Sequence, residues 1–359
     1  MLQAGEKYGA LVRVGPNLLI CSDPDELRRI SGTRTEYTKG PAYDALRVTD
    51  GEPHVVSERD PAKHRSLRAK MGAAYSLDFQ PAIDRQILRL VDLITRKYAF
   101  PHDRISATVH GDDRQPKVMA IDGMLALTLC HGCHRIAGSD TTSNWARMAM
   151  VCLLTCPPAY LALQREIDAA SGSGHLSSPV ATDAEIRILP YLDAVLREAM
   201  RLHPSAVSPA KLCPQRETGA GADTVCGFTV PGGTEVGANV PGFLKSTSVF
   251  GPDAGCFRPE RWLEAARCPN DNRLDRMKAD FDLVFGAGKF QCLGKAIAWM
   301  EIRKLLVELM RRFDFALINN IQPLHQESFG IMVVNDFNVR VTHRAGNADE
   351  YRRGHAQKN

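Results

Sequence analysis

A glycine-rich segment that carries one cysteine and runs into a long helix constrains this chain most. The segment reads FGAGKFQCLGK and covers residues 285–295. Its glycines, Gly286, Gly288 and Gly294, leave the backbone free to adopt turns that a side chain would forbid. After it, apolar residues recur every three or four positions over residues 293–313, which predicts a helix with one buried face.

Cys292 stands between this loop and the predicted helix. A thiolate at such a position gains from the positive end of the helix dipole and from exposed backbone N–H groups. An iron–thiolate bond needs this arrangement, since the sulfur must stay deprotonated. The alternative is an ordinary buried cysteine at a helix start, and other motifs in the chain must decide between the two.

Composition narrows the function classes. The chain has 359 residues, 44% of them hydrophobic, and its formal net charge of +4 is scattered. Without a stripe of Lys and Arg, we expect no nucleic-acid partner. Ten cysteines without the spacing of a secreted domain indicate free thiols in a reducing compartment. No window reaches about 18 consecutive apolar residues, so we expect no membrane anchor in this chain.

Periodicity predicts a mainly helical fold with small β-sheets. A hairpin is expected around the Gly15-Pro16-Asn17 turn, followed by a short helix capped by Ser22 or Asp23. The longer elements that the pattern predicts are helices over 61–98, 120–156, 158–170 and 183–203, short strands over 219–240, and a closing hairpin over 331–344.

Three further motifs carry paired polar residues. In LREAMRLHP, Glu198 and Arg201 are three apart and share a helix face, which alone indicates a surface ion pair. In IAGSDTTSN, Asp140 and Thr141 follow Gly138 within a predicted helix, where a glycine and a hydroxyl favour a local kink.

The third motif, RDPAKHRSLRAKM, places His64 and Arg68 four apart on one helix face, which alone indicates a solvated basic patch.

Together these segments resemble the cytochrome P450 family over nearly the whole chain. The cysteine loop matches the haem-binding pattern Phe-x-x-Gly-x-Arg-x-Cys-x-Gly at Phe285, Gly288, Cys292 and Gly294. One position departs, because Phe290 stands where the family usually has Arg or His against a haem propionate, and Lys289 is the candidate to compensate. In having an aromatic residue at this position, the chain resembles fungal members of the family that are similar to benzoate hydroxylase and pisatin demethylase.

The resemblance gives the other motifs roles. Glu198 and Arg201 match the K-helix pattern Glu-x-x-Arg, and FRPERW supplies the third member, Arg261, of a buried structural network. Residues 137–142 match the I-helix pattern Ala-Gly-x-Asp-Thr-Thr, in which Asp140 and Thr141 relay protons as the catalytic pair.

By the same resemblance, Arg68 and His64 hold a propionate from the C-helix. Substrate-facing residues are expected at Val207, Ser208 and Pro209 and near Phe329.

The implied activity is that of a haem-thiolate monooxygenase of secondary metabolism. It would insert one oxygen atom from O2 into a small lipophilic substrate, aromatic molecules included. The cofactor would be haem b (iron protoporphyrin IX), ligated by Cys292, with electrons from NADPH through a flavoprotein reductase (the NADPH–P450 reductase). Residues 1–359 would form a single domain, monomeric and associated with the cytosolic face of the endoplasmic reticulum membrane.

A rival haem signal is present. Residues 130–134 read Cys-His-Gly-Cys-His and fit the Cys-x-x-Cys-His attachment pattern of c-type haem, or a zinc site at Cys130 and Cys133. The motif lies inside a predicted helix beside IAGSDTT and no export signal precedes it. We interpret it as a chance match.

The chain looks shortened at its N-terminus and between the C- and I-helices, because only 72 residues separate Arg68 from Thr141. A truncated gene model, a splice variant or a degenerate copy would each produce this. Two alternatives therefore stay open: an inactive haem-binding fragment or pseudoenzyme, and a P450-like isomerase or peroxygenase.

Overall fold

The structure is a computed structural model of the chain. It describes residues 5, 7–47, 52–75, 78–99, 118–120, 137–206, 211–213, 223–268, 270–328 and 330–344. The chain divides into two compact units, and each is described by itself. The first contains Met1–Leu77, Arg201–Cys256 and Ala265–Lys295, and the second contains Asp78–Met200, Phe257–Glu264 and Ala296–Asn359.

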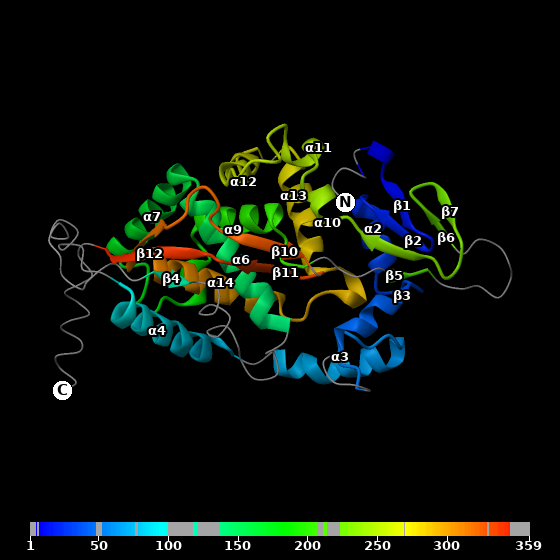
Figure 1. Cartoon of the computed structure of the whole chain (residues 1–359), viewed down its shortest axis with the longest axis horizontal. Coiled ribbons are helices and arrows are strands. Elements are labelled where there is room, and N and C mark those ends of the chain that lie inside the picture. The colour runs from blue at the N-terminus through cyan, green and yellow to red at the C-terminus, as the bar shows by residue number, and fades with distance from the viewer. Residues whose placement is uncertain are drawn as a thin grey trace. The chain divides into compact units, whose positions relative to one another are not determined.

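A five-stranded sheet organises the first unit (Figure 1). Its strands, in spatial order, are β1 (Leu11–Gly15), β2 (Leu18–Cys21), β8 (Glu235–Ala238), β5 (Lys211–Leu212) and β3 (Thr38–Lys39). The β1–β2 hairpin turns at Pro16 and Asn17, which confirms the hairpin predicted there. Only the β2–β8 pairing in this sheet is parallel.

The helices of the first unit begin with α2 (Pro24–Ser31). Asp23 caps this helix, since its side chain accepts hydrogen bonds from the N–H groups of Asp25 and Glu26. Of the two predicted caps, Ser22 and Asp23, the structure therefore has Asp23. The remaining helical elements are η1 (Pro41–Leu46), α3 (Pro61–Tyr75), α10 (Val240–Leu244), α11 (Thr247–Phe250), α13 (Arg273–Asp282), η4 (Leu283–Phe285) and η5 (Gly288–Phe290).

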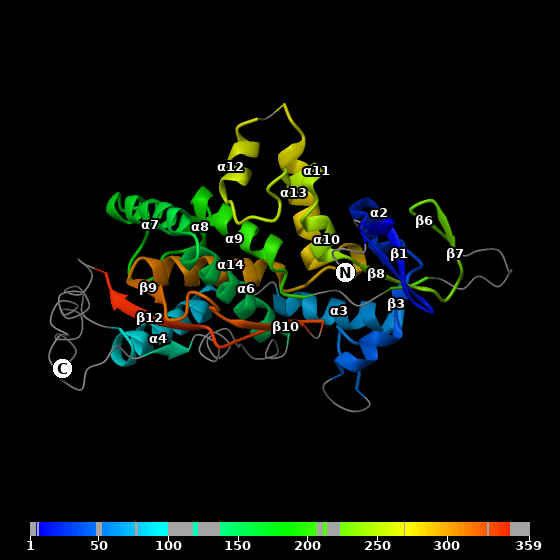
Figure 2. The same ribbon diagram turned by 45° about the horizontal axis from the view of Figure 1, so that its top comes forward.

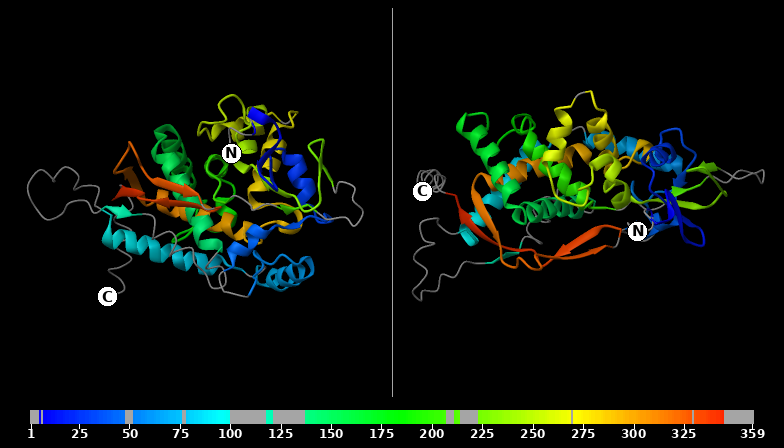
Figure 3. Two further views of the ribbon diagram at one scale, coloured as in Figure 1. Left: turned by 45° about the vertical axis from the view of Figure 1, so that its right-hand side comes forward. Right: turned by 90° about the horizontal axis from the view of Figure 1, so that it is seen from above.

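A separate hairpin in the first unit is formed by β6 (Asp223–Val225) and β7 (Phe228–Val230). In both views of Figure 3 this yellow-green hairpin lies beside the blue strands β1 and β2. Together with β8, it confirms the short strands predicted within residues 219–240.

Helices make up most of the described part of the second unit (Figure 2). They are α4 (Gln80–Lys97), α6 (Ala137–Leu154), α7 (Pro157–Gly172), α8 (Asp183–Ile186) and the larger parts of α9 (Pro190–Leu202), α12 (Glu260–Ala266) and α14 (Lys295–Met310). In its core the indole rings of Trp145 (α6) and Trp299 (α14) meet edge to face, with centroids 4.7 Å apart.

Two small sheets complete the second unit. One has the order β4 (Met119–Ala120), β12 (Asn338–His343), β9 (Phe313–Leu317), and the other pairs β10 (His325–Ser328) with β11 (Met332–Asn335). The prediction of a mainly α fold with small β-sheets is confirmed.

The predicted closing hairpin over 331–344 is wrong. β11 pairs with β10, whereas β12 pairs with β9 and β4. The two residues between them do not make a hairpin turn, because Phe337 is completely buried and anchors the linker in the core. Each tail strand therefore takes a partner from earlier in the chain.

Several helix boundaries also differ from the prediction. The helix expected over 61–98 is two helices, α3 and α4, and Pro81 lies in the first turn of α4, where a missing N–H costs nothing. Likewise the helix expected over 183–203 is two helices, α8 and α9, and α9 begins at Pro190. The last predicted helix ends at Met310, and Phe313 already belongs to β9.

The helix predicted over 120–156 is described only from Ala137 onward, as α6. At its predicted start the structure has β4 instead, in which Ala120 and Met119 pair with Asn338 and Val339 of β12. Residues 121–136 lie outside the described part of the chain.

Candidate haem-thiolate site

The cysteine loop is closed by its own backbone. The N–H of Cys292 donates to the carbonyl oxygen of Phe285 at 2.7 Å. Gly286 has φ +71°, and a Cβ there would lie 2.9 Å from the Phe290 carbonyl oxygen. Gly288 has φ +55°, and a Cβ there would collide with the carbonyl of Ser31 in α2. Both positions therefore require glycine.

Gly294 plays a different part from the one expected. It has no left-handed φ, so no turn at this position requires glycine. A Cβ on Gly294 would instead lie 3.8 Å from the sulfur of Cys292 and 3.8 Å from the ring of Tyr75. The glycine thus leaves space beside the sulfur that any other residue would fill.

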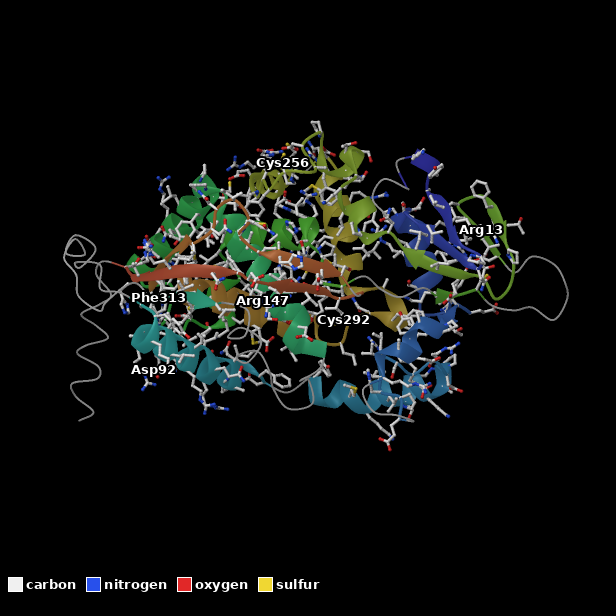
Figure 4. All side chains as sticks on the ribbon, in the orientation of Figure 1. Arg13, Asp92, Arg147, Cys256, Cys292 and Phe313 are labelled. Carbon is white, nitrogen blue, oxygen red and sulfur yellow. The ribbon has the colours of Figure 1, made fainter. Side chains whose placement is uncertain are left out.

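Cys292, labelled in Figure 4, is an exposed residue of the first unit. Nevertheless, burial raises its pKa, because protein atoms crowd the sulfur on the sides away from solvent. The backbone N–H groups of Gly294 and Lys295, and the positive charges of Arg68 and Lys295, act in the opposite direction. The sulfur is therefore both accessible and provided with donors that favour its thiolate form.

The predicted basic pair on α3 faces the cysteine loop. Nη1 of Arg68 donates to the carbonyl oxygen of Gln291 at 2.6 Å. The ring of His64 lies 6.2 Å from the ring of Phe290, centroid to centroid. Burial and the nearby charges of Lys39, Arg68 and Lys289 lower the pKa of His64 to about 4, so this imidazole is neutral at pH 7.

Phe290, which replaces the cation expected from the family pattern, is itself surrounded by lysines. Nζ of Lys211 lies 5.0 Å from its ring centroid, and Nζ of Lys289 lies 5.1 Å from it. Nζ of Lys289 also donates to the Thr35 carbonyl oxygen at 2.8 Å.

Lys39 and Lys211 are the residues that the sequence analysis missed. They form a directly opposed pair of the β3–β5 ladder, and only 5% and 7% of their surfaces are exposed. Burial and the Lys211 charge lower the pKa of Lys39 to about 8. Two isolated lysines far apart in the sequence give no signal that the fold will bury them together.

These residues fit haem b. Its two propionates are anionic, and four cations lie on the Phe290 side of the loop: Lys39, Lys211, Lys289 and Arg68. The neighbouring carboxylate of Glu58 acts to raise the pKa of Lys39 and of His64. A surplus of positive charge, buried at Lys39 and Lys211, lies on the same side of the loop as the Phe290 ring and suits the anionic propionates of such a cofactor.

The catalytic pair predicted in IAGSDTT lies in the second unit, at the start of α6. Asp140 is exposed, Thr141 is half-buried and Thr142 is buried. The backbone carbonyl of Asp140 accepts a hydrogen bond of 3.1 Å from the hydroxyl of Ser143, the kind of side-chain contact that bends helices. The side chain of Ala137 lies outside the described part of the chain.

Glu198, Arg201 and Arg261 are all completely buried. Within the second unit, Nε of Arg261 donates to Glu198 at 2.9 Å, and Nε1 of Trp262 donates to its other carboxylate oxygen at 2.9 Å. Within the first unit, the guanidinium of Arg201 donates to the carbonyl oxygens of Leu244 and Ala254, at 2.8 and 2.6 Å.

Other predicted positions lie outside the described residues: Val207, Ser208, Pro209, Phe329, and the Cys130–His134 motif.

Within the described ranges, no group of three or more His, Cys, Asp or Glu side chains is suited to hold a metal ion. In the same ranges, no single helix is long and apolar enough to cross a membrane, although the bent pair Asp140–Leu154 and Pro157–Gly172 passes that test by length and composition.

The chain is similar to known proteins over most of its length. The family model described as Cytochrome P450 matches residues 124–338. Cytochrome P450 monooxygenase ABA1 of Pyricularia oryzae is 28% identical over 93% of this chain and 84% of the relative. Cytochrome P450 monooxygenase abl1 of Leptosphaeria maculans is 32% identical over 91% of this chain and 75% of the relative.

Among solved structures, the heme domain of a cytochrome P450DA mutant superimposes with a TM-score of 0.72 at 15% identity, over 96% of this chain and 92% of that one. This likeness concerns the fold. The match to the family model and the similarity to the fungal relatives show that the chain belongs to the cytochrome P450 family of haem-thiolate monooxygenases.

Proposed function

We propose that this protein inserts one oxygen atom from O2 into a small lipophilic substrate, aromatic molecules included, with Cys292 as the axial ligand of haem b. One observation carries the proposal: the Cys292 thiol is accessible, lies on a loop closed by a 2.7 Å backbone bond, and receives backbone donors from Gly294 and Lys295.

When bound, haem with a thiolate ligand activates O2 and favours cleavage of its O–O bond. The chain's own contribution is to hold and orient the cofactor. Arg68, Lys39 and Lys211 would bind the propionates, with Lys289 and His64 beside them, and Gly294 would leave room next to the sulfur. Positive charge that is costly to bury would thereby acquire an anionic partner.

Asp140 and Thr141 would hold and pass protons, through a carboxyl and a hydroxyl one residue apart at the start of α6. Val207, Ser208 and Phe329 would contact the substrate. Electrons would come from NADPH through a flavoprotein reductase. The protein would be a monomer of one domain, associated with the cytosolic face of the endoplasmic reticulum membrane. It would act in secondary metabolism.

The test is the absorption spectrum of the purified protein, reduced and bound to carbon monoxide. We expect the red-shifted band of a thiolate–carbonyl adduct, and Cys292→Ser should abolish it. Cys130→Ser and Cys133→Ser are the matched controls and should keep it. If Cys292→Ser retained the band while either control lost it, the ligand assignment would be wrong.

A second candidate, a haem-binding protein without useful turnover, is favoured by one comparison. The alignment with the Pyricularia oryzae monooxygenase spans 440 positions, more than the 359 residues of this chain, so that relative contains internal segments that this chain lacks. A monooxygenase must exclude water from the reacting centre to avoid losing its reducing equivalents.

The two candidates differ in coupling. NADPH consumption and product formation would be measured together, with a reductase supplied and a panel of aromatic substrates. Product in proportion to NADPH, with a marked loss in Thr141→Ala, supports the monooxygenase. NADPH consumption without product, unchanged in Thr141→Ala, supports the second candidate.

A further inference from the structure

Two cysteines of the first unit bring their sulfur atoms together. Cys21 is the last residue of β2, and Cys226 lies in the turn between β6 and β7, 205 residues later. Their sulfur atoms are 3.7 Å apart and share a hydrogen bond. A disulfide holds its sulfur atoms about 2.0 Å apart, so a small side-chain adjustment separates this pair from a covalent link.

The two thiols differ in their surroundings. Cys21 is completely buried, and its thiol is also within hydrogen-bond distance, 3.7 Å, of the Asp23 carbonyl oxygen. Cys226 is half-buried and therefore open to a small reagent. Its φ of +50° is unusual for a residue with a side chain, because turns of this kind favour Asn or Gly.

The hairpin that carries Cys226 is fastened in this position. Arg29 of α2 donates to the Asp223 carboxylate and to the Thr224 carbonyl oxygen, both at 2.9 Å. The Tyr37 hydroxyl donates to the same carboxylate at 2.8 Å. The two sulfurs are thus held near each other by contacts that do not involve them, which lowers the entropy cost of joining them.

We propose that Cys21 and Cys226 form a reversible disulfide when the protein meets hydrogen peroxide. In the first step the Cys226 thiol gives up its proton, the thiolate attacks one peroxide oxygen and the O–O bond breaks. A sulfenic acid forms, and the departing hydroxide takes up that proton and leaves as water. In the second step the Cys21 sulfur attacks the Cys226 sulfur and the S–O bond breaks, and the hydroxyl takes the Cys21 thiol proton and leaves as a second water. Two thiols are oxidised and one peroxide is reduced.

The environment supports this order. Burial raises the pKa of both thiols, but the hydrogen bond between them lowers the pKa of Cys226 and raises that of Cys21 further. Cys226 is therefore the better nucleophile and the more accessible one, and Cys21 is placed to resolve the sulfenic acid.

The bond would tie the end of β2 to the hairpin that leads into β8. Because it closes a loop of 205 residues, it restricts the unfolded chain strongly. We expect a higher midpoint of thermal unfolding after oxidation and a return to the original midpoint after reduction with a dithiol.

The experiment treats the full chain with dilute hydrogen peroxide, blocks the remaining thiols, and maps peptides by mass spectrometry without reduction. We expect a linked peptide pair containing Cys21 and Cys226, with the loss of two hydrogens from the intact mass. The unfolding midpoint should rise by at least about 3 °C, and the dithiol should reverse both changes.

Cys226→Ser should abolish the link and the shift in midpoint, whereas Cys268→Ser, which removes an exposed cysteine, should leave both unchanged. The peptide map of the parent protein does not depend on how either variant folds. Recovery of both cysteines as blocked thiols, or irreversible oxidation of Cys226 beyond the sulfenic acid without a link, would overturn the proposal.

Discussion

Lys39 and Lys211 face each other directly across the β3–β5 ladder with both side chains buried. Like charges in directly opposed positions destabilise a sheet, and burial adds to that cost. Lys39 offsets part of it by donating to the carbonyl oxygens of Val55 and Val56, both at 2.8 Å. An anion bound next to Lys211 and Phe290 would offset more of it.

Lys211→Met should weaken haem binding by about 10- to 100-fold, because one charge-assisted bond to a propionate is lost. Adding Phe290→Arg should restore most of that affinity, because Phe290 lies 5.0 Å from the lysine and takes the position of the usual cation. Titration of haem into apoprotein, followed by absorbance, measures both. Lys63→Met, on the exposed part of α3, is the matched control and should bind haem normally. An equal loss in the control, or no rescue by the arginine, would contradict the assignment.

The haem-free protein should become more stable as pH rises from about 8 to 10.5. In the folded state Lys39 has a pKa of about 8, against an ordinary 10.5, so the unfolded chain binds more protons within that window. The gain is on the order of 2–3 kcal/mol at most. Urea unfolding at pH 7.5 and pH 10 would measure it, and Lys39→Met should reduce the difference. An identical pH dependence in parent and variant would show that Lys39 is not responsible.

Glu198→Ala should lower the free energy of unfolding by about 3–5 kcal/mol, since it leaves the buried Arg261 guanidinium without its carboxylate. The matched control is Glu264→Ala, which breaks the partly exposed pair with Arg258 and should cost under about 1 kcal/mol. Soluble yield and chemical unfolding provide the measurements. A soluble, fully haem-loaded Glu198→Ala protein that is merely slower would assign Glu198 to turnover instead of folding.

Gly288→Ala should destabilise the first unit by about 2–4 kcal/mol, because the new Cβ collides with the Ser31 carbonyl at a left-handed φ. Gly72→Ala is the matched control. A Cβ at Gly72, inside α3, meets nothing within 4 Å, so alanine should be neutral or stabilise by up to about 1 kcal/mol. Thermal unfolding of the two variants side by side gives the comparison, and equal midpoints would show that α2 does not constrain the loop.

Local features of this protein could be predicted from the sequence because they depend on residues a few positions apart. The β1–β2 hairpin follows from a Gly-Pro-Asn turn between apolar runs, and the cap of α2 follows from Asp23 before a helical pattern. The spacing of His64 and Arg68 placed them on one helix face, and both do contact the segment before Cys292. The Cys292 loop itself was evident from its glycines.

Pairings between distant segments were decided only by the tertiary structure. The parallel β2–β8 ladder, the separation of β11 from β12, and the approach of Cys21 to Cys226 each join residues through contacts that no local period encodes. The same holds for Lys39 and Lys211, since a lysine in a two-residue strand carries no sign of burial. Helix period and turn chemistry act within a few residues, whereas burial and strand pairing depend on which distant segments the folded chain brings together.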